Sequence, residues 1–551
     1  MDASATDKLR KQIQQHHVAL KADRAPWEAI WQRVHSLIFS LSRSVIVPNN
    51  IVQINLDLYD GSGMSALRTF ASGISGNVMP RSQPWFNLRY RDPTRNKAAG
   101  VAKFQQDLED VIYSMLDDSN FYEWAYEFAH EGGWACTAAA FIEPIKETKE
   151  IVFTTLPTGT YWIQEDSTGT VDTLFREFDM QSREILKWWG DSLSDDDKRT
   201  MEETPYLKRK ILHAVRPREK FDPADSGNKN FPFESTYWIQ GNMTLLEESG
   251  YRQFPYLVWR VERSLIGPWG LGPGINILRD ATIQQRVAQD MLDADQRLIN
   301  PAREVPESLR DEGYLTHPGG INWIPDTQIG KARPVNEAVN RPVGIDREER
   351  LRQTVEGHFY VPFFLMQSQN ERQMTVPEYM GRAAEQGIIL EPLTNRFSSE
   401  VMDQLLDLLV QYTSDFGLMP DAPADLSEDD NHGIDVEYIG PLATLQKRYH
   451  TMNDMQAFIA AFGAFKQTMP ENSPLIDDNV NVDDIVAKLA EANGVQTVLT
   501  SQADKDKNRQ MRQQAMAMQA QAQVKAQQLQ AVGAMKKQPG APTGTPIGGP
   551  Q

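Results

Sequence analysis

The segment Gly272–Pro301, GPGINILRDATIQQRVAQDMLDADQRLINP, decides the fold because it has the pattern of one long helix. Glycine and proline stand at its start and Asn-Pro at its end, which are helix-boundary signals. Apolar residues follow one helical stripe, formed by Ile283, Val287, Met291, Ala294 and Leu298. Another face carries two i,i+4 ion pairs, Arg286 with Asp290 and Asp293 with Arg297. Such a helix of about 25 residues is a rod about 37 Å long.

The residues after this helix predict a small domain and then a returning helix. Residues 301–344 are rich in turn signals, and Trp323, between Ile321 and Ile324, is interpreted as core of the small domain, with an interface role as the alternative. The run DREERLRQTVEGHFYV, Asp346–Val361, predicts the second and shorter helix. The chain therefore runs out along one helix, forms a small domain and returns.

A short polar loop follows the returning helix. In FFLMQSQNERQMTVPE, Phe363–Glu378, an apolar run ends and the polar residues Gln367–Gln373 precede a helix start. Thr375 is a suitable N-cap, Glu378 completes a capping box, and Pro377 suits the first turn. The residues alone favour a surface connection without a ligand.

The first 250 residues predict an α+β domain. Pro26–Phe39 has helical spacing with Pro26 at its start, and a helix over 120–134 is expected to stop at Gly132 and Gly133. A further amphipathic helix is predicted at FQQDLEDVIYSML, and an acidic helical insert at SREILKWWGDSLSDDDK. From residue 151 the period shortens to that of strands, in IVFTTL, TYWIQ, TVDTLFREF, ILHAVRP, STYWIQ and TLLEES.

The last third is mainly helical. Thr375–Phe416 predicts about 40 helical residues with a kink at Pro392, and DVEYIG predicts a strand. The Ala- and Gln-rich run near residues 508–535 has good helix propensity but buries too little to be stable alone, so it is either disordered or stacked on copies of itself. The end, QPGAPTGTPIGGPQ, is expected to be disordered.

The composition is that of a folded protein. Hydrophobic residues make up 40% of 551, with 12 Trp, 22 Phe and 16 Tyr. The net charge of −19 argues against a basic nucleic-acid binder. No window approaches about 18 consecutive apolar residues, so no membrane span is expected, and the polar N-terminus predicts no signal peptide. Cys136, in the apolar run WACTAAAF, is interpreted as a buried small hydrophobe.

No enzyme motif stands out. The sequence contains no GxxxxGK[ST], HExxH or GxSxG pattern and no paired cysteines. GLGPG at 270–274 is interpreted as a helix-start turn, and the adjacent His16 and His17 point apart on a polar helix, which disfavours a shared metal ion. We therefore expect no catalytic residue, no metal and no cofactor.

Five segments in series resemble the podovirus portal proteins, also called head-to-tail connectors. They are YDGSGMSALRTFASGISGNVMPRSQPWFNLRYRDP (59–93), TGTVDTLFREF (168–178), FPYLVWRVERSLIGPWGLGPGINILRDATIQQ (254–285), QMTVPEYMGRAAEQ (373–386) and EYIGPLATLQKR (437–448). Their order and spacing fit the family over roughly residues 25–450. The last 100 residues contribute little to the resemblance.

The resemblance implies an α+β portal fold with an α+β wing, a long-helix stem, a small α/β clip, a helical crown and a C-terminal helical barrel. The implied parts are the N-terminal wing at 1–271, a stem helix at 272–300, the clip at 301–345, a second stem helix at 346–362, the channel loop at 363–375, the rest of the wing with its long kinked helix and strand at 376–450, the crown at 451–500, the barrel helix at 501–535 and a disordered tail at 536–551.

The resemblance also implies where the chain meets DNA and other proteins. The channel-loop residues expected to face DNA are Gln367, Gln369, Asn370, Arg372 and Gln373. Amide side chains exchange hydrogen bonds with phosphates in many arrangements, and one arginine per subunit adds little salt-dependent affinity, so this loop suits sliding DNA. In the clip, Trp323, Lys331 and Arg333 are the expected docking surface.

The implied partners are other copies of the chain in a homo-dodecameric ring, double-stranded DNA without sequence preference, the terminase large subunit, tail adaptor proteins, and capsid and scaffolding proteins, with no membrane. The implied location is the portal vertex of the virion capsid, and the host cytoplasm during assembly. ATP hydrolysis would belong to the packaging motor. Two alternatives remain at this point, a tail adaptor or nozzle ring and, less favoured, a nuclease whose carboxylates the sequence does not group.

Overall fold

The computed structural model describes residues 3–46, 53–90, 100–221, 227–300, 303–306, 315, 317, 319–324, 333–334, 341–365, 376–421, 423 and 434–440, and the single residues 461, 511 and 518. The chain divides into two units, 1–446 and 447–551. Several predictions fall outside the described residues: the DNA-facing loop residues, Lys331, and nearly all of the predicted crown, barrel helix and tail. Trp323 and Arg333 are described only by their backbone.

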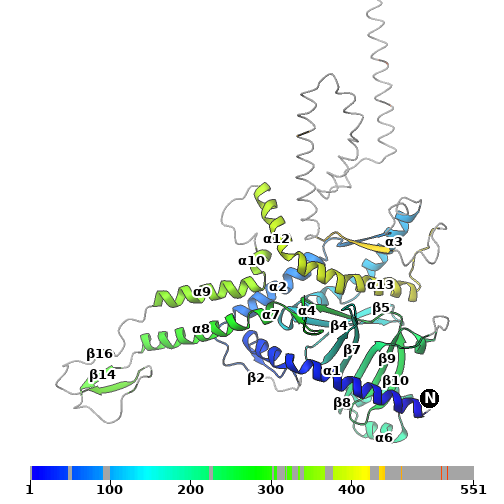
Figure 1. Cartoon of the computed structure of the whole chain (residues 1–551), viewed down its shortest axis with the longest axis horizontal. Helices are drawn as coiled ribbons and strands as arrows, with labels where there is room; N and C mark the ends of the chain where they lie inside the picture. The colour runs from blue at the N-terminus through cyan, green and yellow to red at the C-terminus, as the bar shows by residue number, and fades with distance from the viewer. Residues whose placement is uncertain are drawn as a thin grey trace, which may run out of the picture. The chain divides into compact units, whose positions relative to one another are not determined.

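The largest sheet is a five-stranded antiparallel meander in the order β10-β9-β8-β7-β6 (Figure 1). Its strands are β6 (Tyr161–Glu165), β7 (Val171–Gln181), β8 (Lys208–Pro217), β9 (Phe233–Ile239) and β10 (Thr244–Tyr251). All five were predicted from their period. Adjacent residues of β8 point to opposite faces. Accordingly, Leu212 packs into the cluster with Ile13 of α1 (Ala3–Ile38), whereas Ile211 packs with Ile185 of α5 (Ser182–Trp189).

Helix α1 (Ala3–Ile38) corrects one predicted boundary, because Pro26 lies inside the helix and not at its start. The residues before Pro26 carry an apolar stripe, and Ile13 and Leu20 are buried against Trp162 of the meander. This burial stabilises the first turns and outweighs the hydrogen bond that a proline removes.

The central core joins a second sheet to a group of helices. The sheet has the order β11-β4-β5, with β4 (Thr137–Ile145), β5 (Glu150–Leu156) and β11 (Tyr256–Arg260). The helices α2 (Ser62–Val78), α3 (Val101–Asp117) and α4 (Phe121–Ala135) contribute buried side chains to the same cluster. β5 was predicted, but β4 and β11 were not, because alanine-rich TAAAF and the fully buried YLVWR lack the alternation of a half-exposed strand.

Helix α4 corrects a second boundary, since it runs through Gly132 and Gly133 and ends at Ala135. A Cβ on Gly132 would lie 2.5 Å from Trp259, and one on Gly133 would lie 2.6 Å from Leu67. The two glycines therefore allow close packing and do not stop the helix. Cys136 terminates it with a left-handed φ of 62°.

The predicted long helix is confirmed as α12 (Val376–Phe397), a π-helical turn η5 (Ser398–Met402) and α13 (Asp403–Asp415) in succession. Pro392 lies inside α12, and the departure from α-helical geometry comes at the π-helical turn that follows. The predicted strand is β17 (Ile434–Tyr438), which pairs antiparallel with β3 (Phe86–Tyr90).

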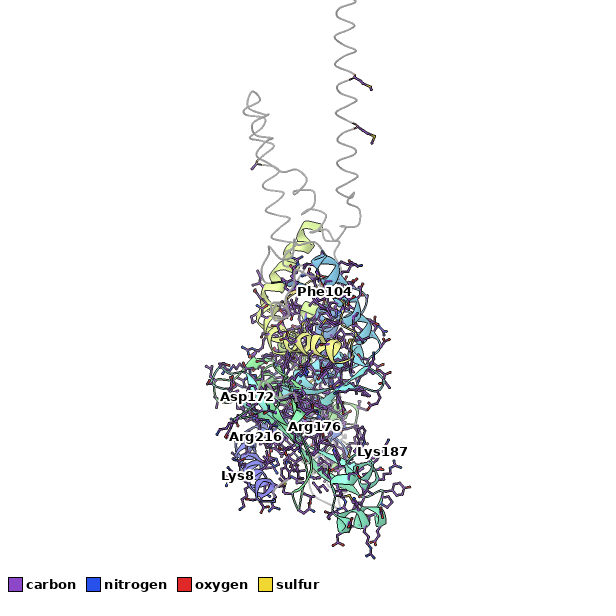
Figure 2. The ribbon with its side chains drawn as sticks, turned by 90° about the vertical axis from the view of Figure 1, so that its right-hand side faces the viewer. Lys8, Phe104, Asp172, Arg176, Lys187 and Arg216 are labelled. Atoms are coloured by element: carbon purple, nitrogen blue, oxygen red, sulfur yellow. The ribbon has the colours of Figure 1, made fainter. Side chains whose placement is uncertain are left out.

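The remaining elements are short or lie beside the core. They are β1 (Leu41–Ser42), β2 (Gln53–Ile54), α5 (Ser182–Trp189), η2 (Gly190–Ser192), α6 (Asp195–Glu203), η3 (Asn228–Asn230), β12 (Glu262–Arg263), β13 (Gly270–Leu271), α7 (Pro273–Asn276), α8 (Leu278–Ile299), β14 (Arg303–Pro306), β15 (Ile321–Ile324), β16 (Arg333–Pro334), α9 (Arg341–His358) and α10 (Val361–Phe364). In the side view, Phe104 of α3 lies above Arg176 of β7, and Lys187 of α5 lies to the right of it (Figure 2).

Candidate functional site

Helices α8 and α9 lie side by side and antiparallel, as the sequence predicts (Figure 1). The imidazole of His358, at the end of α9, lies 3.2 Å from the Asp280 carboxylate near the start of α8. In α8 the stripe residues Ile283, Val287, Met291 and Ala294 are half-buried, whereas Leu298 is exposed. The predicted start of the second helix at Asp346 was wrong, because α9 begins at Arg341 with a proline at its second residue, where the missing N–H costs nothing.

Two buried glutamines join α8 to the turn before α2. The Gln285 side chain accepts hydrogen bonds from the backbone N–H of Tyr59 at 2.7 Å and of Asp60 at 2.9 Å, and donates to the Asp60 carbonyl at 2.8 Å. Gln284 donates to Ser62 Oγ at 2.7 Å, and the Asp60 carboxylate accepts from the Ser62 N–H at 2.7 Å. These contacts explain why YDGSG and the long helix occur together. Nothing in the sequence marks these glutamines as buried.

The GLGPG turn places the start of the helical pair against the core. A Cβ on Gly274 would lie 1.9 Å from the Trp134 carbonyl oxygen, and one on Gly270 would lie 2.2 Å from that of Cys136. Only glycine permits such close backbone contact. Gly270 N–H also donates to Thr137 Oγ1 at 2.8 Å. The turn therefore starts a helix, as predicted, and its glycines allow the backbone to pack closely against the core.

The base of the predicted channel loop is anchored by aromatic side chains. Tyr360 adopts a left-handed φ of 57° and turns the chain into α10. Phe364 packs directly on α2, where a Cβ on Gly73 would lie 2.3 Å from its ring, and its ring centroid lies 6.4 Å from that of Phe70. The described residues resume with α12, so both sides of the loop are helical. The loop residues themselves remain a prediction.

The predicted docking residues are placed only through their backbones. β14 is the central strand of a three-stranded sheet in the order β15-β14-β16. Trp323 pairs with Val305 and Arg333 pairs with Glu304, so the two predicted residues lie on the strands flanking β14. Their role in docking stays a prediction, as does that of Lys331.

No arrangement for chemistry emerges among the described side chains. Cys136 is fully buried, which confirms the interpretation as a buried hydrophobe, and this burial raises the pKa of its thiol to about 12. His213 lies between Tyr256 and Ser235, but all three are fully buried and closed to a substrate, and burial lowers the pKa of His213 well below its usual range. No group of three or more potential metal ligands occurs within the described ranges.

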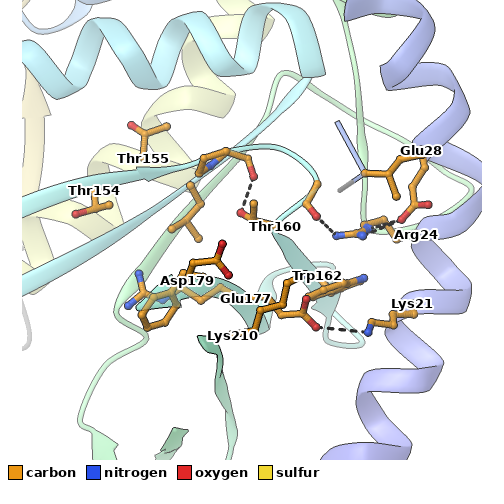
Figure 3. A pocket seen from close by; sticks show the side chains of 16 residues that line it. Lys21, Arg24, Glu28, Thr154, Thr155, Thr160, Trp162, Glu177, Asp179 and Lys210 are labelled. Carbon is orange, nitrogen blue, oxygen red and sulfur yellow. Dashed lines mark hydrogen bonds and ion pairs between the residues drawn. The ribbon is translucent and has the colours of Figure 1, made fainter. Parts of the chain in front are cut away.

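A cavity of about 720 Å³ lies between α1 and the meander (Figure 3). Its wall includes Trp162, whose ring centroid lies 4.1 Å from the Arg24 guanidinium and 5.2 Å from Lys21 Nζ. Arg24 pairs with Glu28 at 2.8 Å, and Lys21 with Glu177 at 3.4 Å. These two wall cations are thus paired with carboxylates of the same chain. In the part of the chain that the structure describes, no helix is long and apolar enough to cross a bilayer.

Comparisons with known proteins find a matching family model and similar proteins from two phages. The family model described as bacteriophage head to tail connecting protein matches residues 10–500. The chain is 26% identical over 468 residues to the probable portal protein of Bordetella phage BPP-1, covering 82% of each chain. It is 25% identical over 523 residues to the portal protein of Salmonella phage epsilon15, covering 91% of this chain and 90% of the relative.

Proposed function

The chain belongs to the bacteriophage head to tail connecting protein family and is a phage portal protein, and on that premise we propose that it forms a dodecameric conduit for double-stranded DNA. The portal is part of the virion at the capsid vertex, a structural and multimeric ring that connects capsid and tail. The observation that carries the proposal is the antiparallel pair α8 and α9, which leaves the wing at a hydrogen-bonded joint and returns from a small sheet.

In this proposal the wing comprises the meander, the central core and the long helix α12–α13. The pair α8 and α9 is the stem, and the β14–β16 sheet belongs to the clip. Residues 451–500 form the crown and 501–535 the barrel helix. Each subunit meets its neighbours through two different faces, because only a head-to-tail contact with a closing rotation makes a ring.

In this proposal, double-stranded DNA passes through the bore and the ring does not recognise its base sequence. The channel loop, with Gln367, Gln369, Asn370, Arg372 and Gln373, contacts phosphates through exchangeable hydrogen bonds. Its two ends are held by α10 on α2 and by α12, so the wing fixes where the loop starts and ends. The ring itself performs no ATP hydrolysis, which is the work of the terminase large subunit docked on the clip.

The clip binds the terminase motor during packaging and tail adaptor proteins afterwards, and capsid and scaffolding proteins surround the ring during assembly in the host cytoplasm. Trp323, Lys331 and Arg333 form the docking surface. Lys331→Glu with Arg333→Glu is expected to weaken terminase binding to purified rings. Lys103→Glu, an exposed charge reversal on α3, is the matched control and is expected to leave that binding unchanged.

Class averages of the purified chain, with its particle mass measured in parallel, test the proposal. Twelvefold rings with a central hole, at about 750 kDa for twelve 62.5 kDa chains, are the expected result. Chains that remain monomers under all conditions would overturn it. Rings that appear only on an added portal would favour a tail adaptor, and metal-dependent DNA cleavage would favour a nuclease.

A further inference from the structure

The hairpin of β12 and β13 presents two aliphatic side chains to solvent at its tip. The strands pair antiparallel through Glu262 with Leu271 and Arg263 with Gly270. Between them, Leu265 is 98% exposed and Ile266 is 90% exposed, the highest values for large apolar side chains among the described residues. Contiguous exposed apolar groups of this kind mark interaction sites.

The tip is held in place by its own chain. The Ile266 N–H donates to Ser264 Oγ at 3.1 Å, and Ser264 is buried. On the other side of the tip, Trp269 is buried with its ring centroid 4.8 Å from that of Trp31 in α1. The residues at the two ends of the tip are thus buried, whereas the two aliphatic side chains between them face solvent.

We propose that this tip, Ser264–Pro268, packs against a second copy of the chain and forms part of the ring interface. The inference rests on the proposed ring, in which every copy meets a neighbour through a face unlike its own. In a closed ring every copy has a neighbouring copy, so a tip that is present on every copy can meet the same partner surface all around the ring. Glu262 and Arg263 are exposed beside the tip and supply the polar rim that surrounds an apolar interface core.

The hairpin comes directly before the helical pair in the chain, so a contact at its tip also affects where that pair begins. From β13 the chain passes directly through α7 into α8, so the hairpin and the stem share one short segment. Arg263 is also tied to Glu165 at the end of β6, at 3.3 Å. A neighbour seated on the tip therefore fixes the start of the stem relative to the meander.

Photo-crosslinking identifies the partner of the tip. A benzophenone amino acid in place of Leu265 is expected to link two chains in assembled rings, giving a band at about twice 62.5 kDa on a denaturing gel. The same group in place of the exposed Glu147, in the β4–β5 turn, is the control. Crosslinks only within one chain, or an equal interchain yield from position 147, would overturn the inference.

Substitution measures what the contact contributes. Leu265→Ser with Ile266→Ser is expected to raise the protein concentration for half-assembly about tenfold or more, because two apolar side chains lose their burial. Leu207→Ser, another exposed leucine, is the matched control. An unchanged half-assembly concentration would overturn the inference while the rings still support the proposed function. Failure of the unchanged chain to form rings would instead overturn the proposed function and, with it, the partner of the tip.

Discussion

Arg260 and Glu400, 140 residues apart in the chain, form a buried ion pair between β11 and the π-helical turn. Arg260 Nη2 lies 2.6 Å from Glu400 Oε1, and the Arg260 backbone N–H donates to Glu400 Oε2 at 2.8 Å. The other side of the guanidinium donates to Glu165 at 2.7 Å and to the Gly169 carbonyl at 2.8 Å. One side chain therefore ties the small sheet, the meander and the long helix together.

Glu400→Ala is expected to lower the free energy of unfolding by about 3 kcal/mol, because it leaves the Arg260 guanidinium buried with only part of its partners. Urea unfolding of the variant measures this change. The control is Glu203→Ala, which removes an exposed i,i+4 pair with Arg199 and is expected to change stability by less than about 0.5 kcal/mol. Equal effects of the two substitutions would contradict the role of the buried pair.

Gly73 and Gly76 of α2 allow a controlled test of the packing at the base of the channel loop. Gly73→Ala is expected to destabilise the chain by about 1–2 kcal/mol, because its Cβ would displace the Phe364 ring. Gly76→Ala, with no atom within 4 Å, is expected to stabilise the helix by about 0.5–1 kcal/mol. Thermal unfolding gives both signs, and hydrogen exchange of α10 shows whether the loop base is loosened. A stabilising Gly73→Ala would rule out the packing described for Phe364.

His17 makes stability depend on pH. Burial lowers the pKa of His17 to about 3, and the cations Lys21 and Arg24 act in the same direction. The Glu177 carboxylate 3.5 Å away favours the charged form, but it is shared with Lys21 and Gln240, and burial prevails.

Below pH 6.5 the unfolded chain binds a proton at His17 that the folded chain does not, so stability falls from about pH 6.5 towards about pH 3. His17→Gln is expected to reduce this slope by about 1.4 kcal/mol per pH unit between pH 6 and pH 4. Urea unfolding at several pH values gives both slopes. Parallel curves for the two chains would show that His17 titrates normally.

The channel loop is expected to avoid strong attachment to DNA. Gln369→Lys with Gln373→Lys should steepen the plot of log binding constant against log salt by at least about 0.9, the value for one further phosphate contact. Binding of duplex DNA to purified rings at several salt concentrations measures the slope. Thr200→Lys, on exposed α6, adds a charge elsewhere and serves as the control. A slope that the loop lysines leave unchanged would place the loop away from DNA.

The sequence predicts elements well where one local pattern decides them. The strands of the meander, the helices α8 and α9 and the continuous helix on both sides of Pro392 all appear where their pattern predicts them, although α9 begins at Arg341 and not at Asp346. The prediction failed at Pro26 and Gly132, because residues that usually mark boundaries are accommodated here by packing against distant side chains. The expected DNA-facing loop and clip docking residues remain predictions.

By itself the sequence determined the succession of a long helix, a small domain and a returning helix, because helical period, proline and glycine act within a few residues of one another. Only the tertiary structure decided what holds that pair to the rest of the chain, and what joins the small core sheet to the long helix. Gln285 meets the Tyr59–Asp60 turn, and Arg260 meets Glu400, across more than a hundred residues of chain. Such contacts depend on which polar groups burial brings together, and a buried glutamine or arginine has no local pattern that distinguishes it from an exposed one.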